Sequence, residues 1–194
     1  MIKTWIAAAM AVICSFLGIY DYGEEQITEG YALMEAEDYA GATEQFDAAL
    51  VQVEEEAKEH PDEEIETYVI TEAYRGLGMA AYEMHEYQLC IDYLQKAIDE
   101  GTKPTPVMYN LVGISKMKLE DYEGALSIFE QGAALQQESE EVSEEVFREM
   151  RFNRIVCYER LFDWENAKLE AEAYLQRYPE DDEIQKEYAF LKTR

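Results

Sequence analysis

The stretch GYALMEAEDYAGATEQFDAA, residues 30–49, contains the pattern on which the fold prediction rests. Gly30 is followed eight and nine positions later by Asp38 and Tyr39. Apolar residues then come at helical spacings of three and four, at Ala42, Phe46 and Ala49. An acidic residue and an aromatic between two helical patterns indicate a turn and the start of a second helix. The stretch therefore predicts two helices joined by a tight turn.

The same pattern recurs three more times along the chain. The equivalents of Gly30, Asp38 and Tyr39 are Gly78, Glu86 and Tyr87, then Gly113, Asp121 and Tyr122, then Ile155, Asp163 and Trp164. The apolar positions that follow are Cys90, Leu94 and Ala97, then Ala125, Phe129 and Gly132, then Ala167, Ala171 and Tyr174. Self-similarity of this kind, in a chain without strand patterns, indicates a helical repeat architecture.

The spacing has a direct physical reason. Two antiparallel helices need small residues where their backbones approach, and the first helices supply Gly30, Gly78 and Gly113. The second helices have a small residue one turn after the aromatic, at Ala42, Cys90, Ala125 and Ala167. The four aromatics are then expected to lie between successive hairpins.

These residues closely resemble the signature of the tetratricopeptide repeat family. That signature has a small residue in the first helix, an aromatic at the start of the second, Ala one turn later, a bulky residue, another Ala and a closing Pro, here Pro179. The fourth copy departs from it at Ile155 and Tyr174. The resemblance implies an all-α fold, a right-handed α-solenoid of about four hairpins in residues 21–194. The expected repeats are 23–56, 71–104, 106–139 and 148–181.

Three segments outside the repeated pattern carry helix signals. The breaker His60-Pro61-Asp62 lies between two helix-forming stretches, and we expect the helices on either side to be longer by about two turns each. Gly101 marks a helix end, while Thr105 and Pro106 mark the N-cap and first residue of the next helix. After the last repeat, an apolar stripe of Ile184, Tyr188 and Leu191 predicts a capping helix over about 181–192.

Residues 1–20 predict a hydrophobic helix that is a signal peptide or a membrane anchor. Lys3 precedes an uncharged run of 17 residues, Thr4–Tyr20, and acidic residues follow it. The run exceeds a usual signal core and just reaches the length of a bilayer span, so both alternatives stay open. The charge bias places the folded part outside the cytoplasmic membrane, at the cell membrane of a bacterial envelope or secreted. Cys14 resembles a lipoprotein cysteine, although Ile13 stands where a small residue is usual.

The composition argues against nucleic acid as a partner and against catalysis. Asp and Glu number 43 against 16 Lys and Arg, for a net charge of −27 that repels phosphate backbones. The three cysteines do not form a paired framework, and His60 and His85 have no His or Cys at metal-ligand spacing. We therefore expect no enzyme activity, no catalytic residues, no cofactor and no metal.

The resemblance also nominates a peptide-binding groove. In tetratricopeptide proteins the concave wall is lined by first-helix residues that face away from the second helix. The matching positions are Ile27, Tyr31, Met34, Arg75, Met79, Tyr82, Asn110, Ile114, Met117, Phe152, Val156 and Glu159. This wall is mostly apolar, which favours an apolar or amphipathic peptide. Only Arg75 and Asn110 fit the family's carboxylate clamp, so that binding mode is not expected.

The functional expectation is a protein-interaction scaffold, tethered outside the membrane, that binds a peptide or protein segment in this groove. The alternative is a structural envelope protein whose wall meets another copy of itself in a homo-oligomer. The sequence does not name the partner.

Overall fold

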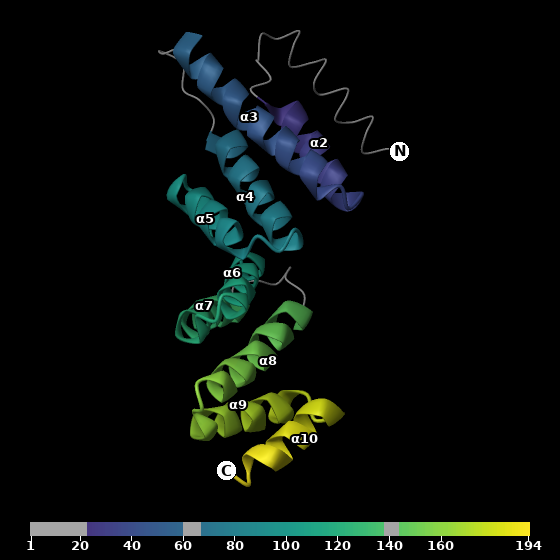
Figure 1. Cartoon of the computed structure of the whole chain (residues 1–194), viewed down its shortest axis with the longest axis vertical. Helices are drawn as coiled ribbons and strands as arrows, with labels where there is room; N and C mark the ends of the chain where they lie inside the picture. The colour runs from purple at the N-terminus through teal and green to yellow at the C-terminus, as the bar shows by residue number, and fades with distance from the viewer. Residues whose placement is uncertain (1–22, 60–66, 138–143) are drawn as a thin grey trace. The chain divides into compact units, whose positions relative to one another are not determined.

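The structure is a computed structural model that describes residues 23–59, 67–137 and 144–194 (Figure 1). All regular elements in these ranges are helices, which confirms the predicted all-α class. They are α2 (Glu24–Glu35), α3 (Tyr39–Glu59), α4 (Thr67–Glu83), α5 (Tyr87–Asp99), α6 (Pro106–Lys118), α7 (Tyr122–Ala134), the 3-10 helix η1 (Leu135–Gln137), α8 (Glu144–Arg160), α9 (Trp164–Arg177) and α10 (Asp182–Leu191). The predicted N-terminal helix and Cys14 lie outside the described residues.

The chain falls into two compact units. Unit 1 extends to Met84 and includes Gln95–Thr102, so it contains α2, α3 and α4. Unit 2 comprises His85–Leu94 and Lys103–Arg194, so it contains α6 to α10. Helix α5 contributes to both units.

Each helix hairpin turns at the predicted place. The second helices α3, α5, α7 and α9 begin at Tyr39, Tyr87, Tyr122 and Trp164, the four aromatics of the repeated pattern. Two positions before each aromatic, the backbone is left-handed, with φ of 62° at Glu37, 63° at His85, 63° at Glu120 and 59° at Phe162. The repeat therefore extends to backbone conformation as well as to residue type.

The left-handed residue completes a Schellman cap at the end of the first helix. The Glu37 amide donates to the Met34 carbonyl at 3.1 Å, and the Asp38 amide donates to the Leu33 carbonyl at 2.9 Å. The same pair of bonds recurs in the turns at Glu120 and Phe162. These bonds satisfy carbonyls that the end of the helix would leave without partners.

The segments between hairpins largely follow the sequence signals. Helix α3 has 21 residues against 13 in α5 and α7, about two turns more. Helix α4 has 17 residues, about one turn more than α6 with 13, and the rest of the insert lies outside the described residues. The Thr105 hydroxyl accepts a hydrogen bond from the Met108 amide, and Pro106 begins α6 as predicted. Gly101 has a positive φ of 111° at the end of α5.

The core of unit 1 is built around the Phe46 ring. Figure 1 shows α2 and α4 on either side of α3, the helix that carries this ring. A methyl group on Gly30 of α2 would lie 2.6 Å from the ring, and one on Gly76 of α4 would lie closer still. Both helices therefore approach the ring as only glycine allows. Gly30 was predicted for this role, whereas Gly76 belongs to no repeated position.

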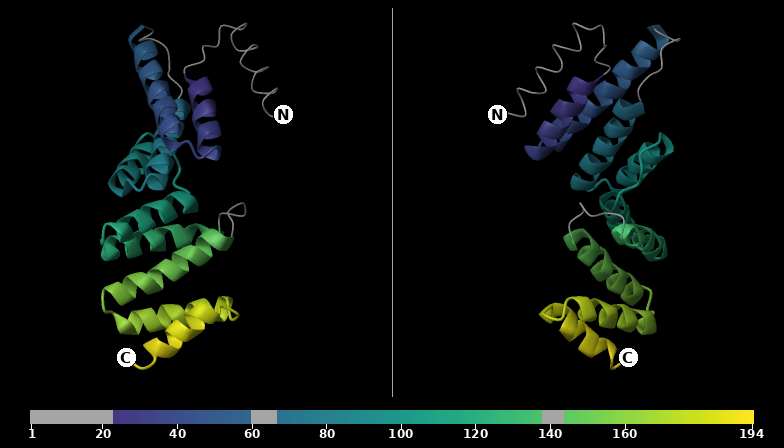
Figure 2. Two further views of the ribbon diagram at one scale, coloured as in Figure 1. Left: turned by 45° about the vertical axis from the view of Figure 1, so that its right-hand side comes forward. Right: turned by 180° about the vertical axis from the view of Figure 1, so that it is seen from behind.

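The core of unit 2 runs from α6 to α10 (Figure 2). Phe129 of α7 is fully buried against Gly113 of α6 in the same way. Further along, α8, α9 and α10 share one apolar cluster, of which Ile155, Ala167, Ala171, Tyr174, Tyr178, Ile184 and Leu191 are the buried members. Helix α10 thus covers an apolar face of α9 with the predicted stripe.

The two cysteines in the described residues are free thiols packed in the interior. Cys90 and Cys157 both have no exposed surface. Burial raises the pKa of Cys90 to about 11 and that of Cys157 to about 12, so both thiols stay protonated. Their role is to fill positions that require a small apolar side chain.

No helix in the described ranges is long and apolar enough to cross a bilayer.

Candidate peptide-binding wall

In unit 1 the predicted wall residues lie on α2 and α4. Ile27 is buried, with 4% of its surface exposed. The other five are partly exposed, namely Tyr31, Met34, Arg75, Met79 and Tyr82. The wall of this unit is therefore accessible except at Ile27.

Tyr31 and Arg75 form a polar cluster with Glu72. The Arg75 Nε donates to the Tyr31 hydroxyl at 3.1 Å, and that hydroxyl donates to Glu72 Oε2 at 3.1 Å. Arg75 and Glu72 form an ion pair at 2.6 Å, and burial raises the pKa of Tyr31 to about 12. Arg75 therefore joins α4 to α2. If Arg75 turned toward a ligand instead, the partly buried groups of Tyr31 and Glu72 would lose their partner.

In unit 2 the wall residues of α6 are mostly inaccessible. Asn110 and Ile114 are 6% and 9% exposed, and Met117 is half-buried. The Asn110 amide donates to Glu149 Oε2 of α8 at 2.6 Å. The two polar wall residues that resemble part of a carboxylate clamp, Arg75 and Asn110, are therefore both bonded within their own units.

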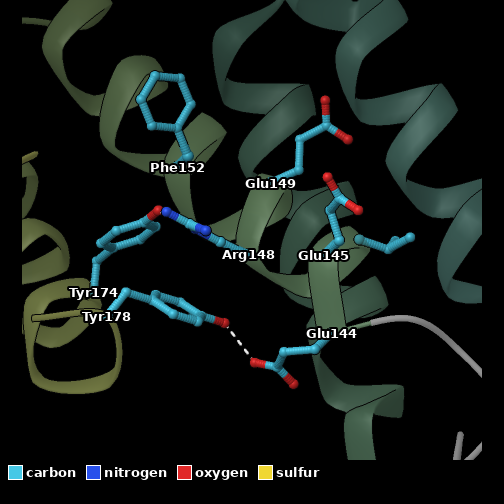
Figure 3. A pocket seen from close by; sticks show the side chains of 8 residues that line it. Glu144, Glu145, Arg148, Glu149, Phe152, Tyr174 and Tyr178 are labelled. Atoms are coloured by element: carbon cyan, nitrogen blue, oxygen red, sulfur yellow. Dashed lines mark hydrogen bonds between the residues drawn. The ribbon is translucent and has the colours of Figure 1, made fainter. Parts of the chain in front are cut away.

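All three wall residues on α8 line open hollows at the surface. Phe152 lies in a hollow of about 880 Å³, which we call the Phe152 hollow (Figure 3). Its other residues are Glu144, Glu145, Val146, Arg148, Glu149, Tyr174 and Tyr178. Val156 and Glu159 line a second hollow of about 530 Å³, the Trp164 pocket, together with Phe162, Trp164, Glu187 and Phe190. Helix α8 thus places all three of its predicted wall residues beside open hollows.

One side of the Phe152 hollow is fixed by Arg148. Figure 3 shows its side chain reaching toward the Tyr174 hydroxyl, to which Nε donates at 2.9 Å. The same guanidinium pairs with Asp181 at 2.7 Å and lies 5.2 Å from the centre of the Tyr178 ring. The Tyr174 hydroxyl also donates to Asp181, at 2.7 Å. Arg148 therefore holds the ends of α8 and α9 together.

A second link is made by Glu144, at the start of α8. It accepts hydrogen bonds from Arg177 at 2.7 and 3.0 Å and from the Tyr178 hydroxyl, the bond drawn in Figure 3. The Arg177 bond, followed by the Tyr178 bond, lowers the pKa of Glu144 to about 2. The Arg148 bond likewise lowers the pKa of Asp181 to about 2. Both carboxylates are therefore ionised and engaged at neutral pH.

The Trp164 pocket combines aromatic rings with carboxylates. The rings of Phe162 and Trp164 meet edge to face, with centroids 5.8 Å apart. Burial, followed by the hydrogen bond and charge of Glu187, raises the pKa of Glu159 to about 7. Glu159 thus lies close to a second acidic group in a partly apolar recess, which opposes the ionisation of Glu159.

Several residues of these hollows were not anticipated from the sequence. Arg148, Tyr178 and Phe190 lie outside the repeat positions that nominate a wall, and their charges or rings meet only in the folded unit. Phe162 did carry a signal. It stands at a turn position that is Glu37, His85 and Glu120 in the other hairpins, so an apolar ring there breaks the pattern.

The described residues hold no group of three or more His, Cys, Asp or Glu side chains placed to bind a metal ion. His85 lies in a turn with Nδ1 3.2 Å from the Tyr87 hydroxyl, and His60 is outside the described residues.

Comparison with known proteins gives a likeness of fold. No family model and no curated protein matches the sequence. The structure is similar to that of a thermophilic TPR protein from Thermus thermophilus, with 15% identity, a TM-score of 0.45, and coverage of 89% of this chain and 100% of the other. It is also similar to a tetratricopeptide repeat protein from Parabacteroides merdae, with 15% identity, a TM-score of 0.47, and coverage of 89% and 73%. The spacing of turns and helices in the chain itself resembles the helix-hairpin repeat of tetratricopeptide repeat proteins.

Proposed function

We propose that the chain is a non-catalytic scaffold that binds a peptide segment of another protein along the α8 wall, defined as Phe152, Val156 and Glu159. The observation that carries the proposal is that all three side chains line open hollows. In the described part of unit 2, hollows open beside this face of α8, whereas α10 covers an apolar face of α9.

The chemistry of the α8 wall fits an amphipathic segment. Phe152 and Val156 offer apolar contact area, and the hollows around them are edged by carboxylates and by the tyrosines of α9. A ligand with apolar anchors and basic or neutral flanks would complement both features.

We further propose that the scaffold is displayed outside the cytoplasmic membrane. The support is the order of charges around the N-terminal apolar run, with Lys3 before Thr4–Tyr20 and Asp21 directly after it. Mass spectrometry of the N-terminus of the native protein tests this proposal. A mature chain that begins after the run, is acylated, or keeps the run in a membrane fraction agrees with it, whereas an intact chain in the cytoplasmic fraction contradicts it.

Selection from a random peptide library tests the binding proposal. We expect enriched peptides to bind the wild-type chain and to lose about fivefold or more in affinity for Val156→Glu, because the added carboxylate must be desolvated in the contact, a cost of roughly 1–3 kcal/mol. Leu169→Glu is the matched control, since Leu169 lies on α9, is 53% exposed and lines neither hollow.

Two results would contradict the proposal. One is that selected peptides bind Val156→Glu as tightly as the wild-type chain. The other is a change of mass in solution, from an oligomer to a monomer, on the Val156→Glu substitution. In that second case the α8 wall would be an interface between copies of the chain.

A further inference from the structure

Phe162 has an unfavourable backbone conformation and an exposed ring, and the turn does not require a phenylalanine. It is 75% exposed and has a left-handed backbone with φ of 59°. A bulky residue in this conformation is unusual, and water contact adds a second cost for the ring. The three equivalent turns make the same bend with Glu37, His85 and Glu120. Such an outlier points to a role of the side chain outside the fold.

The aromatic rings around Phe162 already accept a cation within the molecule. The Arg194 guanidinium lies 4.5 Å from the centre of the Phe190 ring and 5.4 Å from that of Trp164. These distances are within the range of favourable cation–π contact. Arg194 does not line the Trp164 pocket, in which Phe162, Trp164 and Phe190 present further aromatic surface.

The carboxylates of the pocket lack a matching positive charge. Among the described residues that line it, Glu159, Glu187 and Glu120 are acidic and Arg160 is basic, while Arg194 lies against two of its rings. The Glu159 Oε1 atom is buried and has no hydrogen-bond partner within the described residues. A buried acceptor of this kind costs free energy until a donor reaches it, and that cost is larger for a charged group.

We propose that the Trp164 pocket binds a lysine or arginine side chain of the peptide partner. The aromatic rings would contact the methylenes and the charged head of that side chain, while Glu159 and Glu187 would accept its hydrogen bonds. This inference rests on the proposed function, because it assigns the pocket to the same ligand as the α8 wall. It adds a charge requirement to a wall that was expected to be mainly apolar.

An organic cation fits the pocket better than a metal ion. Hard divalent ions take six or more oxygen ligands, whereas two facing carboxylates and several rings offer few oxygens and much apolar surface. An alkylammonium or guanidinium group gains from both kinds of surface. The net charge of −27 also attracts basic segments to the molecule.

Trp164 provides a direct reporter for this test. The chain has two tryptophans, so Trp5→Phe leaves the Trp164 indole as the single tryptophan signal in an NMR spectrum of the full chain. The probes are Nα-acetyl-lysine methylamide and its norleucine counterpart, whose side chain ends in a methyl group at Cε, with a hydrogen in place of the ammonium. We expect the lysine probe to shift the indole resonance and to bind roughly tenfold more tightly than the norleucine probe.

Two variants and one control locate the effect. Phe162→Gly removes the ring, so we expect weaker binding of the lysine probe. Glycine adopts the left-handed conformation of this position freely, so we expect an unchanged or higher urea midpoint. Glu159→Gln removes a charge without changing shape and should also weaken binding. The control is Glu165→Gln, which loses the same charge on the first turn of α9, outside the Trp164 pocket, and should bind as the parent does.

Binding of the lysine probe should also depend on pH. Glu159 has a pKa near 7, so raising the pH from about 6 to about 8 ionises it and should strengthen binding. Glu187 of α10 and Arg160 of α8 act on its charge, and Glu120 and Tyr122 also line the pocket. In Glu159→Gln we expect this pH dependence to become much weaker.

The outcomes separate this inference from the proposed function. Equal binding of the two probes, equal loss in Glu165→Gln, or an indole shift with Ca²⁺ but not with the lysine probe would each overturn the inference. If library peptides depend on Val156 but contain no Lys or Arg and ignore Glu159→Gln, the proposed function stands and the inference fails. If the lysine probe binds but no selected peptide depends on Val156, the pocket stands and the proposed function fails.

Discussion

Glu37 occupies a backbone conformation that disfavours every residue except glycine, with φ of 62°. A left-handed residue with a side chain costs roughly 1–2 kcal/mol, and glycine removes this cost while adding about 0.4–1 kcal/mol of unfolded-state entropy. We therefore expect Glu37→Gly to raise the free energy of unfolding by roughly 0.5–1 kcal/mol, measured by urea denaturation. Glu44→Gly is the control, because it removes the same charge from the helical interior of α3 and should lower the free energy of unfolding by roughly 0.5–1 kcal/mol. Destabilisation by both substitutions would contradict the assigned cap.

The sequence predicted the positions of the hairpin turns but not their backbone conformation. The acidic–aromatic pairs, such as Asp38 and Tyr39, fixed where each second helix begins. The left-handed residue comes directly before the pair and is Glu in two turns, His in one and Phe in one. The type can vary because the Schellman bonds are made by backbone atoms. Residue identity at Glu37 or Phe162 therefore carries little information about the bend, and Phe162 stands out only by comparison with its equivalents.

At the scale of helix pairs, the contact between Gly76 and Phe46 sets the spacing of α3 and α4. A methyl group on Gly76 would collide with the ring, and overpacking of this kind costs about 1–3 kcal/mol. Since Ala also gains up to about 1 kcal/mol in helix propensity over Gly, we expect Gly76→Ala to lower the free energy of unfolding by about 1–2 kcal/mol.

A double mutant checks this explanation. Phe46→Leu gives the new methyl group space, so Gly76→Ala should cost clearly less in the Phe46→Leu background than in the wild-type chain, again by urea denaturation. Equal costs in the two backgrounds would show that the ring does not set the spacing.

The ends of α8, α9 and α10 depend on ionised carboxylates. Asp181 caps α10 through the Ile184 amide and pairs with Arg148, which lowers its pKa from 3.8 to about 2. The unfolded chain therefore takes up a proton before the folded chain does, so the stability from this group is full above pH 4 and is lost as pH falls toward 2. We expect Asp181→Asn to reduce the loss of unfolding free energy between these pH values.

The exposed Asp182 of the same helical turn is the matched control for this pH series. Asp182→Asn should keep the acid dependence of the wild-type chain, measured by urea denaturation at each pH. If Asp181→Asn also keeps it, the Arg148 pair contributes nothing to acid stability.

Helix existence and helix starts could be predicted from local signals. Thr105 and Pro106 mark the start of α6 through a side-chain hydrogen bond and a fixed φ, both of which are properties of neighbouring residues. Packing between helices was less visible in the sequence. Gly76 has no equivalent in the other copies, so its contact with Phe46 depends on how two whole helices approach.

At the scale of the whole chain, the net charge of −27 produces self-repulsion in the folded state. Salt screens exposed charges, with a Debye length that falls from about 30 Å at 0.01 M to about 8 Å at 0.15 M. We expect the melting temperature to rise as NaCl is added over about this range. Glu55→Lys, on the acidic face of α3 that also carries Glu44 and Asp47, should show a smaller rise. A melting temperature that falls with salt in both proteins would contradict this.

The candidate site could be predicted only in part, because contacts between helices decide which of the predicted wall residues are exposed. The repeat offsets nominated twelve wall residues from the geometry of an average hairpin. The structure buries Ile27 and Ile114, uses Arg75 and Asn110 in bonds between helices, and opens hollows beside Phe152, Val156 and Glu159. These differences arise from side chains on neighbouring helices, such as Tyr31, Glu149 and Trp164, which the offsets do not include.

Site-specific photo-crosslinking shows whether a peptide binds along the α8 wall. A benzoylphenylalanine placed at position 156 of the full chain, and separately at position 169, is irradiated with a peptide selected on the wild-type chain. We predict a cross-linked product at position 156 and none at position 169, because Leu169 is exposed but lies outside both hollows. Cross-linking at position 169 without cross-linking at position 156 would contradict the claim.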